Sequence, residues 1–439
     1  MPASTAHDRP GAGTERIASV AVIGMGYVGL PTALGLHAGG LSVIGIDHSE
    51  ARLAAIRASD VDLIEADLRR LDKALREDGF TLTSDIGRLA EADAVMVCVP
   101  TPIDNHLMPD LEPLRAACTS LIEHVVPGQT LILTSTSFVG TTRRLLVEPL
   151  TAQGFTVGRD VFVASSPERI DPGNVTHTQA ETPRVLGGVS EGCVSRARRL
   201  LSVLTPAVHE VGSPEAAEMT KLYENSFRAV NIALANEFAE ICTALSLDPM
   251  EITEAAATKP YGFMRFDPGP GVGGHCIPCD PHYLLWQLRA TRDQAPLVTQ
   301  AMAAIAQRPR QIADRVLDTL SRSGRGLAGT RVIVVGVTYK PGVKDVRSSS
   351  ALDIIGLLTA GGAQVGFHDP LVDEVRLPDG TLLRGAVRPD GADWDLALIH
   401  TEHPGHDYGW VADCPTVVDA TYRFGPAAAA EPQAPSLSL

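Results

Sequence analysis

A glycine-rich turn between two short apolar segments is the feature that most constrains how this chain can fold. Gly24, Gly26 and Gly29 directly follow the apolar segment 19–23, and Asp47 closes the next apolar segment. In a βαβ unit such glycines let the backbone turn tightly beside a pyrophosphate, and the acid accepts hydrogen bonds from ribose hydroxyls. Because strand, turn, helix, second strand and acid occur in this order, the sequence predicts a dinucleotide-binding unit.

The charges near the expected ribose site bear on which dinucleotide binds. The Asp47 carboxylate would repel a 2′-phosphate, which favours NAD over NADP, while Arg52 carries the opposite preference. We therefore expect NAD as the cofactor. The residues of this unit that we expect to contact it are Gly24, Gly26, Tyr27, Val28, Gly29, Asp47 and Arg52.

Short apolar segments alternate with amphipathic ones up to about residue 210. The expected strands are 19–24, 41–47, 93–100, 130–135 and 161–165. Such alternation is typical of a parallel, doubly wound sheet with helices between its strands. The pattern changes at Pro214, where apolar residues recur at helical spacing for about thirty positions. We expect this segment to form one long helix that joins two domains and packs against a partner chain.

A second βα alternation begins at Thr330. Its expected strands are 331–336, 363–369, 394–400 and 416–419, with a helix at 349–360 after the first. The predicted fold class is therefore α/β, with two Rossmann-like doubly wound domains joined by a long central helix. The expected domains are 17–210, 211–323 and 324–425, and the ends 1–16 and 426–439, which are poor in aromatic residues, are expected to be disordered.

Composition excludes several classes of function. The 439 residues carry a formal net charge of −15, whereas nucleic-acid binding needs a dense basic surface. The seven cysteines are odd in number and scattered, which is typical of reduced thiols in a cytosol. Residues 1–16 lack the apolar core of a signal peptide, and the most apolar stretch, 19–46, is interrupted by glycines. We expect a cytoplasmic protein that binds neither nucleic acid nor a membrane.

A loop rich in glycine and proline, 268–282, contains two cysteines and two histidines. Three interpretations are open: a zinc site made by His275, Cys276, Cys279 and His282, a dithiol redox pair, or Cys276 as a lone nucleophile. Structural zinc sites draw their ligands from two separated segments, whereas these four lie within eight residues. A redox pair normally precedes a thioredoxin-like helix start, which we do not expect here. An accessible thiol flanked by flexible backbone favours the nucleophile, and no metal is expected.

Two further groups of polar residues present charge to a ligand. Lys221 and Asn225 are four residues apart in the long helix, so they share a face and present an ammonium and an amide together. A solvated surface pair is the alternative interpretation, and the commoner one for such residues. Lys340, Lys344 and Arg347 follow a strand of the second βα unit, where a sheet crevice suits an anionic ligand. That unit has no second GxGxxG motif, so we expect no second dinucleotide there.

Together these motifs resemble the nucleotide-sugar dehydrogenases that make UDP-uronic acids. The resemblance extends over about 400 residues and includes VCVPTP (97–102), STSFVGTT (135–142), SPERIDPGN (166–174) and YKPGVKDVRSS (339–349). It implies an N-terminal NAD domain, a central helix that makes a homodimer and a C-terminal domain that helps to bind a UDP-sugar.

The resemblance also implies a role for each matching residue. Catalysis would use Cys276, Lys221, Asn225, Asp280, Thr136 and Glu168. Beyond the glycine turn, cofactor binding would use Thr101, Thr136, Cys279 and Arg347. Substrate binding would use Glu168, Arg169, Lys221, Asn225, Arg265, Phe266, Gly273 and Lys340.

Within the family, three loops favour an acetamido sugar. SPERIDPGN, the segment 269–284 and TKPYGFMRF (258–266) are similar to those of enzymes that act on UDP-N-acetylglucosamine or UDP-N-acetylmannosamine. UDP-glucose enzymes tend to carry PEFLREG and a lysine three residues after the cysteine, and this chain has neither. A UDP-glucose 6-dehydrogenase is the alternative.

The expected reaction oxidises the C6 hydroxymethyl group of the UDP-sugar to a carboxylate. This removes four electrons and consumes two NAD, with a thiohemiacetal and then a thioester on Cys276. Two rivals belong to other classes: a catalytically silent NAD-binding scaffold, and a two-electron dehydrogenase of the 2-hydroxyacid or 6-phosphogluconate type. Neither rival needs a nucleophilic cysteine.

Overall fold

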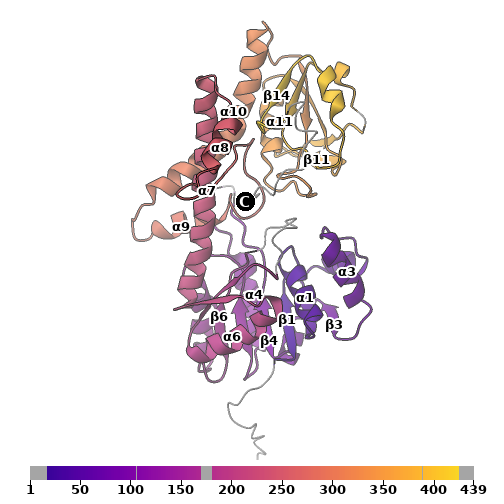
Figure 1. Ribbon diagram of the computed structural model, residues 1–439. Coiled ribbons are helices and arrows are strands. Elements are labelled where there is room, and N and C mark those ends of the chain that lie inside the picture. The colour runs from indigo at the N-terminus through magenta and orange to yellow at the C-terminus, as the bar shows by residue number, and fades with distance from the viewer. Residues whose placement is uncertain (1–16, 105, 170–179, 388, 425–439) are drawn as a thin grey trace, which may run out of the picture.

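The computed structural model describes residues 17–104, 106–169, 180–387 and 389–424. Two α/β units lie one above the other, and a long helix, α7, runs from the first to the second (Figure 1). The two chain ends that we expect to be disordered lie outside the described residues, as do residues 170–174 of SPERIDPGN.

The N-terminal unit is built on a sheet of eight strands among the described residues, in the order β3-β2-β1-β4-β5-β6-β7-β8. The strands are β1 (Ser19–Ile23), β2 (Ser42–Ile46), β3 (Phe80–Thr83), β4 (Ala94–Val97), β5 (Thr130–Leu133), β6 (Phe162–Ser165), β7 (Arg184–Gly188) and β8 (Val208–Val211). Strand β1 pairs in parallel with both β2 and β4, so the strand order reverses there and opens a crevice at the carboxyl ends. The prediction of a wholly parallel sheet is wrong at one place, because β7 runs antiparallel to β6.

Helices cover both faces of this sheet because alternate residues of its strands point to opposite sides. Val20 and Val22 of β1 belong to the core beneath α1 and α6, whereas Ala21 and Ile23 belong to the core beneath α4. The helices of the unit are α1 (Gly29–Ala38), α2 (Glu50–Arg57), α3 (Glu65–Ala74), η1 (Ile86–Glu91), α4 (Glu112–His124), η2 (Arg143–Val147), α5 (Glu148–Ala152) and α6 (Glu191–Leu204).

The long helix predicted after residue 210 is confirmed as α7 (Pro214–Ala244). Its first turn is capped by the Ser213 hydroxyl, which accepts a hydrogen bond from the Ala216 amide at 3.2 Å. One turn later the buried Glu218 carboxylate accepts hydrogen bonds from the amides of Gly140 (2.6 Å) and Thr142 (2.8 Å). These bonds fix the lower end of α7 to the N-terminal unit.

Three further helices complete the middle of the molecule: α8 (Pro249–Ala257), α9 (Asp280–Leu288) and α10 (Pro296–Arg322). Helix α10 packs along α7 and also contacts α11 of the C-terminal unit (Figure 1). The buried Arg308 of α10 donates hydrogen bonds to the Gly269 carbonyl (2.9 Å), the Glu240 carboxylate (2.6 Å) and the Tyr422 hydroxyl (2.9 Å). One arginine thus holds a glycine-rich loop, α7 and the end of the C-terminal unit together.

The C-terminal unit contains a parallel four-stranded sheet among the described residues, in the order β10-β9-β13-β14. Its elements are β9 (Arg331–Val335), α11 (Ser350–Ala360), β10 (Gln364–His368), η3 (Gly391–Asp393), β13 (Leu396–Ile399), η4 (Gly409–Asp413) and β14 (Val417–Asp419). A small hairpin, β11 (Glu374–Arg376) and β12 (Leu382–Arg384), lies between β10 and β13 in the chain. The predicted fold class of two Rossmann-like units joined by a long helix is confirmed. Within the described residues, no helix combines the length and the hydropathy that a membrane crossing requires.

Candidate active site

The glycine turn after β1 has the geometry that a bound pyrophosphate requires. Gly24 has φ +91°, and a Cβ atom there would lie 2.8 Å from the Cys98 carbonyl oxygen. A Cβ on Gly29 would lie 1.7 Å from the Gly24 carbonyl oxygen, whereas a Cβ on Gly26 would meet no protein atom within 4 Å. A side chain at Gly24 or Gly29 would therefore collide with the backbone of the protein itself. Gly26 faces open space, where a ligand can approach the chain.

Asp47, at the end of β2, is fixed beside this turn. Its two carboxylate oxygens accept hydrogen bonds from the amides of Met25 (2.8 Å) and Ser49 (2.9 Å). Arg52 donates from Nε to the Met25 carbonyl at 2.8 Å. Both charged residues therefore hold the turn, and the carboxylate keeps lone pairs for ribose hydroxyls. The turn and its acid fit a dinucleotide such as NAD.

The loop that carries Cys276 (residues 269–279, the Cys loop) is tied to both units. On one side the Gly274 amide donates to the Arg347 carbonyl at 2.9 Å, and a Cβ on Gly273 would lie 2.4 Å from the Tyr339 Cβ. On the other side the buried Tyr283 of α9 donates its hydroxyl proton to the Thr101 carbonyl at 2.9 Å. The Cys loop therefore lies between the two nucleotide-binding units.

Cys276 itself is partly exposed and stands at the turn that leads into α9. Its carbonyl accepts hydrogen bonds from the amides of Cys279 (3.2 Å) and Asp280 (2.8 Å). The expectation that no helix start follows the cysteine pair is wrong, because α9 begins at Asp280. Burial, followed by the charges of Asp280 and Cys276, raises the pKa of the Cys279 thiol to about 12, so that this sulfur stays protonated.

Asp280 joins the Cys loop to α7. The Asn225 amide donates to the Asp280 carboxylate at 2.5 Å, and the Lys221 ammonium acts on the same carboxylate. All three side chains are buried. Burial raises the pKa of Asp280 from 3.8 to about 6, against the opposing effects of Lys221 and Asn225. The structure thus brings together the side chains of Lys221, Asn225 and Asp280, and the Asp280 amide is bonded to the Cys276 carbonyl. The interpretation of Lys221 and Asn225 as a solvated surface pair is wrong.

Glu168 and Arg169 follow β6 and are held by ion pairs. The buried Glu168 carboxylate lies against the guanidinium of Arg184, at the start of β7. Arg169 donates its amide to Glu168 at 2.8 Å and its guanidinium to Glu224 of α7 at 2.5 Å. The predicted substrate loop therefore starts from a buried anchor beside the carboxyl end of the sheet.

A second loop, residues 337–347 (the lysine loop), follows β9 and reaches the glycine turn. The Arg347 guanidinium carbon lies 4.0 Å from the centroid of the Tyr27 ring, and Asp345 holds the guanidinium at 2.7 Å. Burial, followed by the charge of Asp345, raises the pKa of Asp62 in the N-terminal unit. The charges of Lys344 and then Arg347 oppose this rise, so Asp62 lies close enough to the lysine loop to respond to its charges. Lys340 is partly buried in the same loop.

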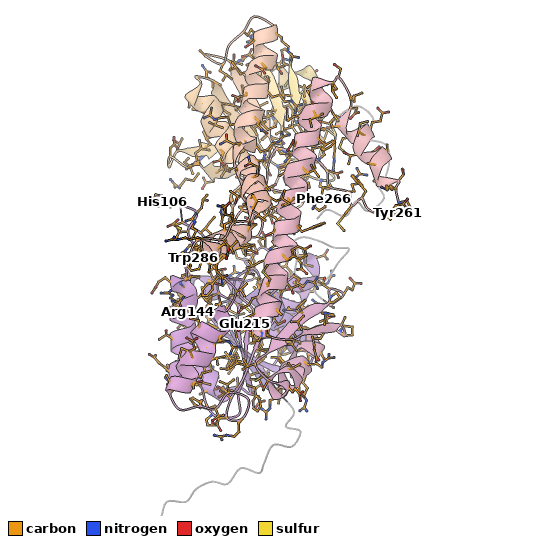
Figure 2. The ribbon with its side chains drawn as sticks, turned by 90° about the vertical axis from the view of Figure 1, so that its left-hand side faces the viewer. His106, Arg144, Glu215, Tyr261, Phe266 and Trp286 are labelled. Atoms are coloured by element: carbon orange, nitrogen blue, oxygen red, sulfur yellow. The ribbon has the colours of Figure 1, made fainter. Side chains whose placement is uncertain are left out.

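The remaining predicted residues lie in two places. Thr101 and Thr136 follow β4 and β5, on the side of the sheet that faces the Cys loop. Arg265 pairs with Asp267 at 2.7 Å, and Phe266 packs against Phe227 on the outer face of α7 at 5.9 Å between ring centroids. Figure 2 shows Phe266 beside the long helix and Tyr261 at the outer edge of the molecule. These contacts are with α7 and α8 and not with Cys276.

Three residues of the site were not predicted from the sequence. Arg184 is buried against Glu168, Tyr283 links α9 to Thr101, and Asp345 holds Arg347. Asp345 had a readable signal, because an acid two residues before a predicted ligand-binding arginine is placed to orient it. The other two had none, because their partners are far away in the sequence.

Comparison with known proteins matches three segments of the chain to the domains of one family. Residues 18–205 match the NAD binding domain of the UDP-glucose/GDP-mannose dehydrogenase family, residues 215–305 its central domain and residues 333–423 its UDP binding domain. CapL of Staphylococcus aureus is 34% identical over 358 residues, which cover 81% of this chain and 83% of CapL. The UDP-N-acetyl-D-mannosamine dehydrogenase of Escherichia coli K12 is 34% identical over 352 residues, 78% of this chain and 82% of that protein.

Solved structures agree with this. The UDP-D-ManNAc dehydrogenase of Pyrococcus horikoshii superposes with a TM-score of 0.83 at 29% identity, over 92% of this chain and 95% of that one. The UDP-glucose dehydrogenase of Pyrobaculum islandicum also reaches a TM-score of 0.83, at 25% identity, over 96% and 98% of the two chains. The cofactor is NAD. With its NAD binding, central and UDP binding domains matched in order, this chain belongs to the UDP-glucose/GDP-mannose dehydrogenase family.

Proposed function

We propose that this protein oxidises the C6 hydroxymethyl group of a UDP-sugar to a carboxylate, with Cys276 as the covalent nucleophile. The NAD-dependent dehydrogenation of a UDP-sugar follows from the family. The observation that carries the cysteine mechanism is the position of the Cys loop. The loop is bonded to the UDP-binding unit at Arg347 and leads directly into α9, whose Tyr283 is bonded to the NAD-binding unit at Thr101. In this proposal the sulfur of Cys276 faces both the bound cofactor and the sugar.

An acetamido sugar is the substrate that we favour, either UDP-N-acetylmannosamine or UDP-N-acetylglucosamine. Relatives from bacteria and archaea that cover most of this chain carry the name UDP-N-acetyl-D-mannosamine dehydrogenase. The loops 166–174 and 269–284 support the same assignment. UDP-glucose is the alternative, because a UDP-glucose dehydrogenase and a UDP-D-ManNAc dehydrogenase fit this fold equally well.

The chemistry divides into two oxidations and a hydrolysis. When bound, NAD accepts one hydride in each oxidation, so two NAD serve one turnover. Between the oxidations the Cys276 sulfur bonds to the aldehyde carbon, and the thiol proton passes to the aldehyde oxygen, which makes a thiohemiacetal. After the second oxidation this carbon is a thioester. Attack by water then breaks the carbon–sulfur bond, releases the carboxylate and returns a proton to Cys276.

We propose that Lys221 and Asn225 stabilise the oxygen of these tetrahedral species. Asn225 gives one amide hydrogen to Asp280, which fixes its orientation and leaves its second hydrogen for the substrate oxygen. A buried ammonium and an amide aimed at one oxygen stabilise a developing negative charge by several kcal/mol, on the order of 3. The Asp280 carboxylate opposes the buried positive charge of Lys221, which offsets part of the cost of burying that charge.

We assign the remaining residues by position. Asp280 and Thr136 orient the water and the thiol, and Glu168 contacts the sugar or that water. Lys340 meets the diphosphate of the nucleotide sugar, where an ammonium suits an anion. Arg347 lies on the NAD side of the cleft, because it covers Tyr27.

A substrate panel tests the proposal directly. The protein is mixed with NAD and with UDP-N-acetylmannosamine, UDP-N-acetylglucosamine or UDP-glucose in turn, and NADH is followed by absorbance. We expect two NADH for each molecule of acid formed, with an acetamido sugar as the preferred substrate. One NADH per sugar would indicate a two-electron dehydrogenase, and none with any of the three would indicate the NAD-binding scaffold.

A homodimer through α7 is part of the same proposal. Apolar side chains are exposed along one face of α7, and an isolated chain would leave them in water. They are Met219, Tyr223, Phe227, Leu234, Phe238 and Ile241. Light scattering should give a dimer for the wild type and a monomer for Leu234→Asp, whereas Leu382→Asp, at an exposed leucine of the β11–β12 hairpin, should stay dimeric. A cytoplasmic location is also proposed, because seven free thiols suit a reducing compartment.

A further inference from the structure

A buried histidine stands behind the lysine loop. His403 follows β13, and its imidazole lies between the lysine loop and Asp369, which follows β10. Nδ1 lies 3.0 Å from the Gly342 amide nitrogen, and Nε2 lies 3.2 Å from both the Asp369 carboxylate and the Thr338 hydroxyl. His403 is 3% exposed and Asp369 7%. The imidazole therefore makes all its polar contacts inside the protein.

These contacts admit one arrangement of protons. The Gly342 amide can only donate, so Nδ1 accepts and the ring proton sits on Nε2. The Thr338 hydroxyl donates its own proton to the Lys340 carbonyl at 3.1 Å, so toward His403 it can only accept. The proton on Nε2 is therefore shared between two acceptors, the Thr338 hydroxyl and the Asp369 carboxylate. Burial raises the pKa of Asp369, but hydrogen bonds from His403 and from backbone amides outweigh it and lower the pKa overall. The carboxylate is thus charged and holds the imidazole in this tautomer.

The same contacts fix the backbone on either side of Pro341. Proline has no amide hydrogen, so the segment is held through its neighbours. The Lys340 carbonyl is bound by Thr338, and the Gly342 amide is bound by His403. The Tyr339 amide donates to the Asp345 carbonyl at 3.1 Å and closes the loop around this point. An exposed turn at Pro341 and Gly342 is therefore anchored by a buried side chain from the segment that follows β13.

We infer that His403 is a positioning residue for the nucleotide sugar, acting through Gly342 to set the place of Lys340. The inference rests on the proposed function, which puts Lys340 at the diphosphate. An ammonium on a flexible stem binds a diphosphate well only if its backbone is held, since otherwise ordering the loop opposes binding. Without the Gly342 bond the turn at Pro341 and Gly342 is free to move, whereas Arg347 is still held by Asp345. The affinity for UDP therefore falls while the NAD site stays intact.

Two near-isosteric variants separate the two contacts of the ring. In His403→Asn the amide oxygen takes the place of Nδ1 and still accepts from Gly342, but the contact with Asp369 is lost. In His403→Gln the amide nitrogen takes the place of Nε2 and still donates to Asp369, but nothing accepts from Gly342. Tyr408→Phe is a matched control, because it removes a different buried hydrogen bond, from the His403 amide to the Tyr408 hydroxyl at 2.9 Å.

The experiment measures UDP binding by calorimetry on the full chain, KM for NAD and for the UDP-sugar, and the melting temperature of each variant. We expect His403→Gln to weaken UDP binding and to raise the UDP-sugar KM about fivefold to tenfold, which is the usual effect of one lost hydrogen bond. His403→Asn and Tyr408→Phe should stay within about twofold of the wild type in UDP affinity, even where they melt lower. KM for NAD should be unchanged in all three.

Two results would overturn the inference. One is an unchanged UDP affinity in His403→Gln, and the other is an equal loss of affinity in all three variants that follows their melting temperatures. UDP binding requires no turnover, so a wild type that binds UDP but oxidises no UDP-sugar would contradict the proposed function and still leave the comparison of the variants decisive for His403.

Discussion

The guanidinium of Arg347 stacks on the ring of Tyr27, with 4.0 Å between the guanidinium carbon and the ring centroid. Tyr27 belongs to the glycine turn of the N-terminal unit, and Arg347 belongs to the lysine loop of the C-terminal unit. Asp345 holds the guanidinium in place at 2.7 Å. The two nucleotide-binding units therefore meet through a cation and an aromatic ring beside the glycine turn, where we propose that NAD binds.

A double-mutant cycle should detect this contact in NAD binding. Tyr27→Ala and Arg347→Ala should each raise KM for NAD, and the double variant should be less affected than the sum predicts. We expect a coupling of about 0.5–1 kcal/mol, as for a partly exposed cation–π pair. Tyr27→Phe keeps the ring and should behave like the wild type. Strictly additive effects would mean that the stack makes no contribution.

The three glycines of the turn should separate into two classes. Gly26→Ala places a methyl group in open space, so the free energy of unfolding should change by less than about 0.5 kcal/mol, while NAD binding weakens about tenfold by steric conflict. Gly29→Ala collides with the Gly24 carbonyl and should cost about 1–3 kcal/mol of stability. Urea titration and NAD calorimetry measure the two quantities. Unchanged NAD affinity in Gly26→Ala would place the cofactor elsewhere.

Removal of the Cys276 sulfur should stop acid formation without loss of the cofactor. Cys276→Ser cannot form the thioester, so turnover to the UDP-uronic acid should fall by at least about a thousandfold, while the dissociation constant for NAD stays within about twofold. Cys118→Ala, at a buried cysteine of α4, should turn over normally. The acid is measured by mass spectrometry. Two NADH per sugar at the wild-type rate in Cys276→Ser would show that the reaction needs no thioester on Cys276.

The rate should depend on the ionisation of Asp280. Its pKa is raised to about 6, so the carboxylate is protonated below that pH. The protonated group neither fixes the Asn225 amide nor balances the charge of Lys221. We expect kcat/KM to fall about tenfold per pH unit below about pH 6. In Asp280→Asn the rate should be low at every pH and should show no such limb. If kcat/KM of the variant fell over the same pH range as that of the wild type, the fall would belong to another ionisable group.

The raised pKa of Asp280 also makes the free energy of unfolding depend on pH. The dependence has the opposite sign to that of a typical aspartate, whose pKa is lowered by folding. The folded pKa of about 6 lies above the ordinary value of 3.8, so the folded state binds the proton more tightly than the unfolded state. The stabilising contribution of Asp280 is complete below about pH 4 and is lost as the pH rises towards about 6, by at most about 3 kcal/mol. Relative to Asp280→Asn, the wild type should therefore lose stability over that range, as urea titrations at several pH values would show.

The parts of the fold that follow from local patterns could be predicted. The glycine turn and α7 are examples, since a turn motif and a helical spacing are properties of neighbouring residues. Strand β7 was missed because RVLGG is short and ends in two glycines, and its antiparallel pairing with β6 is decided by the sheet. The hairpin β11–β12 had a readable signal, the turn dipeptide Asp379-Gly380, and was overlooked.

The site divides in the same way. Lys221 and Asn225 could be placed on one face because both lie in one helix, but their buried partner Asp280 is 55 residues from Asn225. His403 gave no signal, because Gly342, Asp369 and Thr338 come together only where three strands of the sheet end. Pairings of this kind depend on the order of the strands in the sheet, which local sequence patterns do not reveal.

The hydrogen bond between Arg308 and Tyr422 links the last described residues of the chain to the loop that carries Cys276. Arg308 also holds the Gly269 carbonyl, the first residue of the loop that ends at the two cysteines. A shortened version of the protein that stops before Tyr422 would loosen that loop from a distance. An affinity tag is therefore better joined beyond Phe424 by a spacer, and a loss of activity on trimming this end would not by itself mean that the trimmed residues touch substrate.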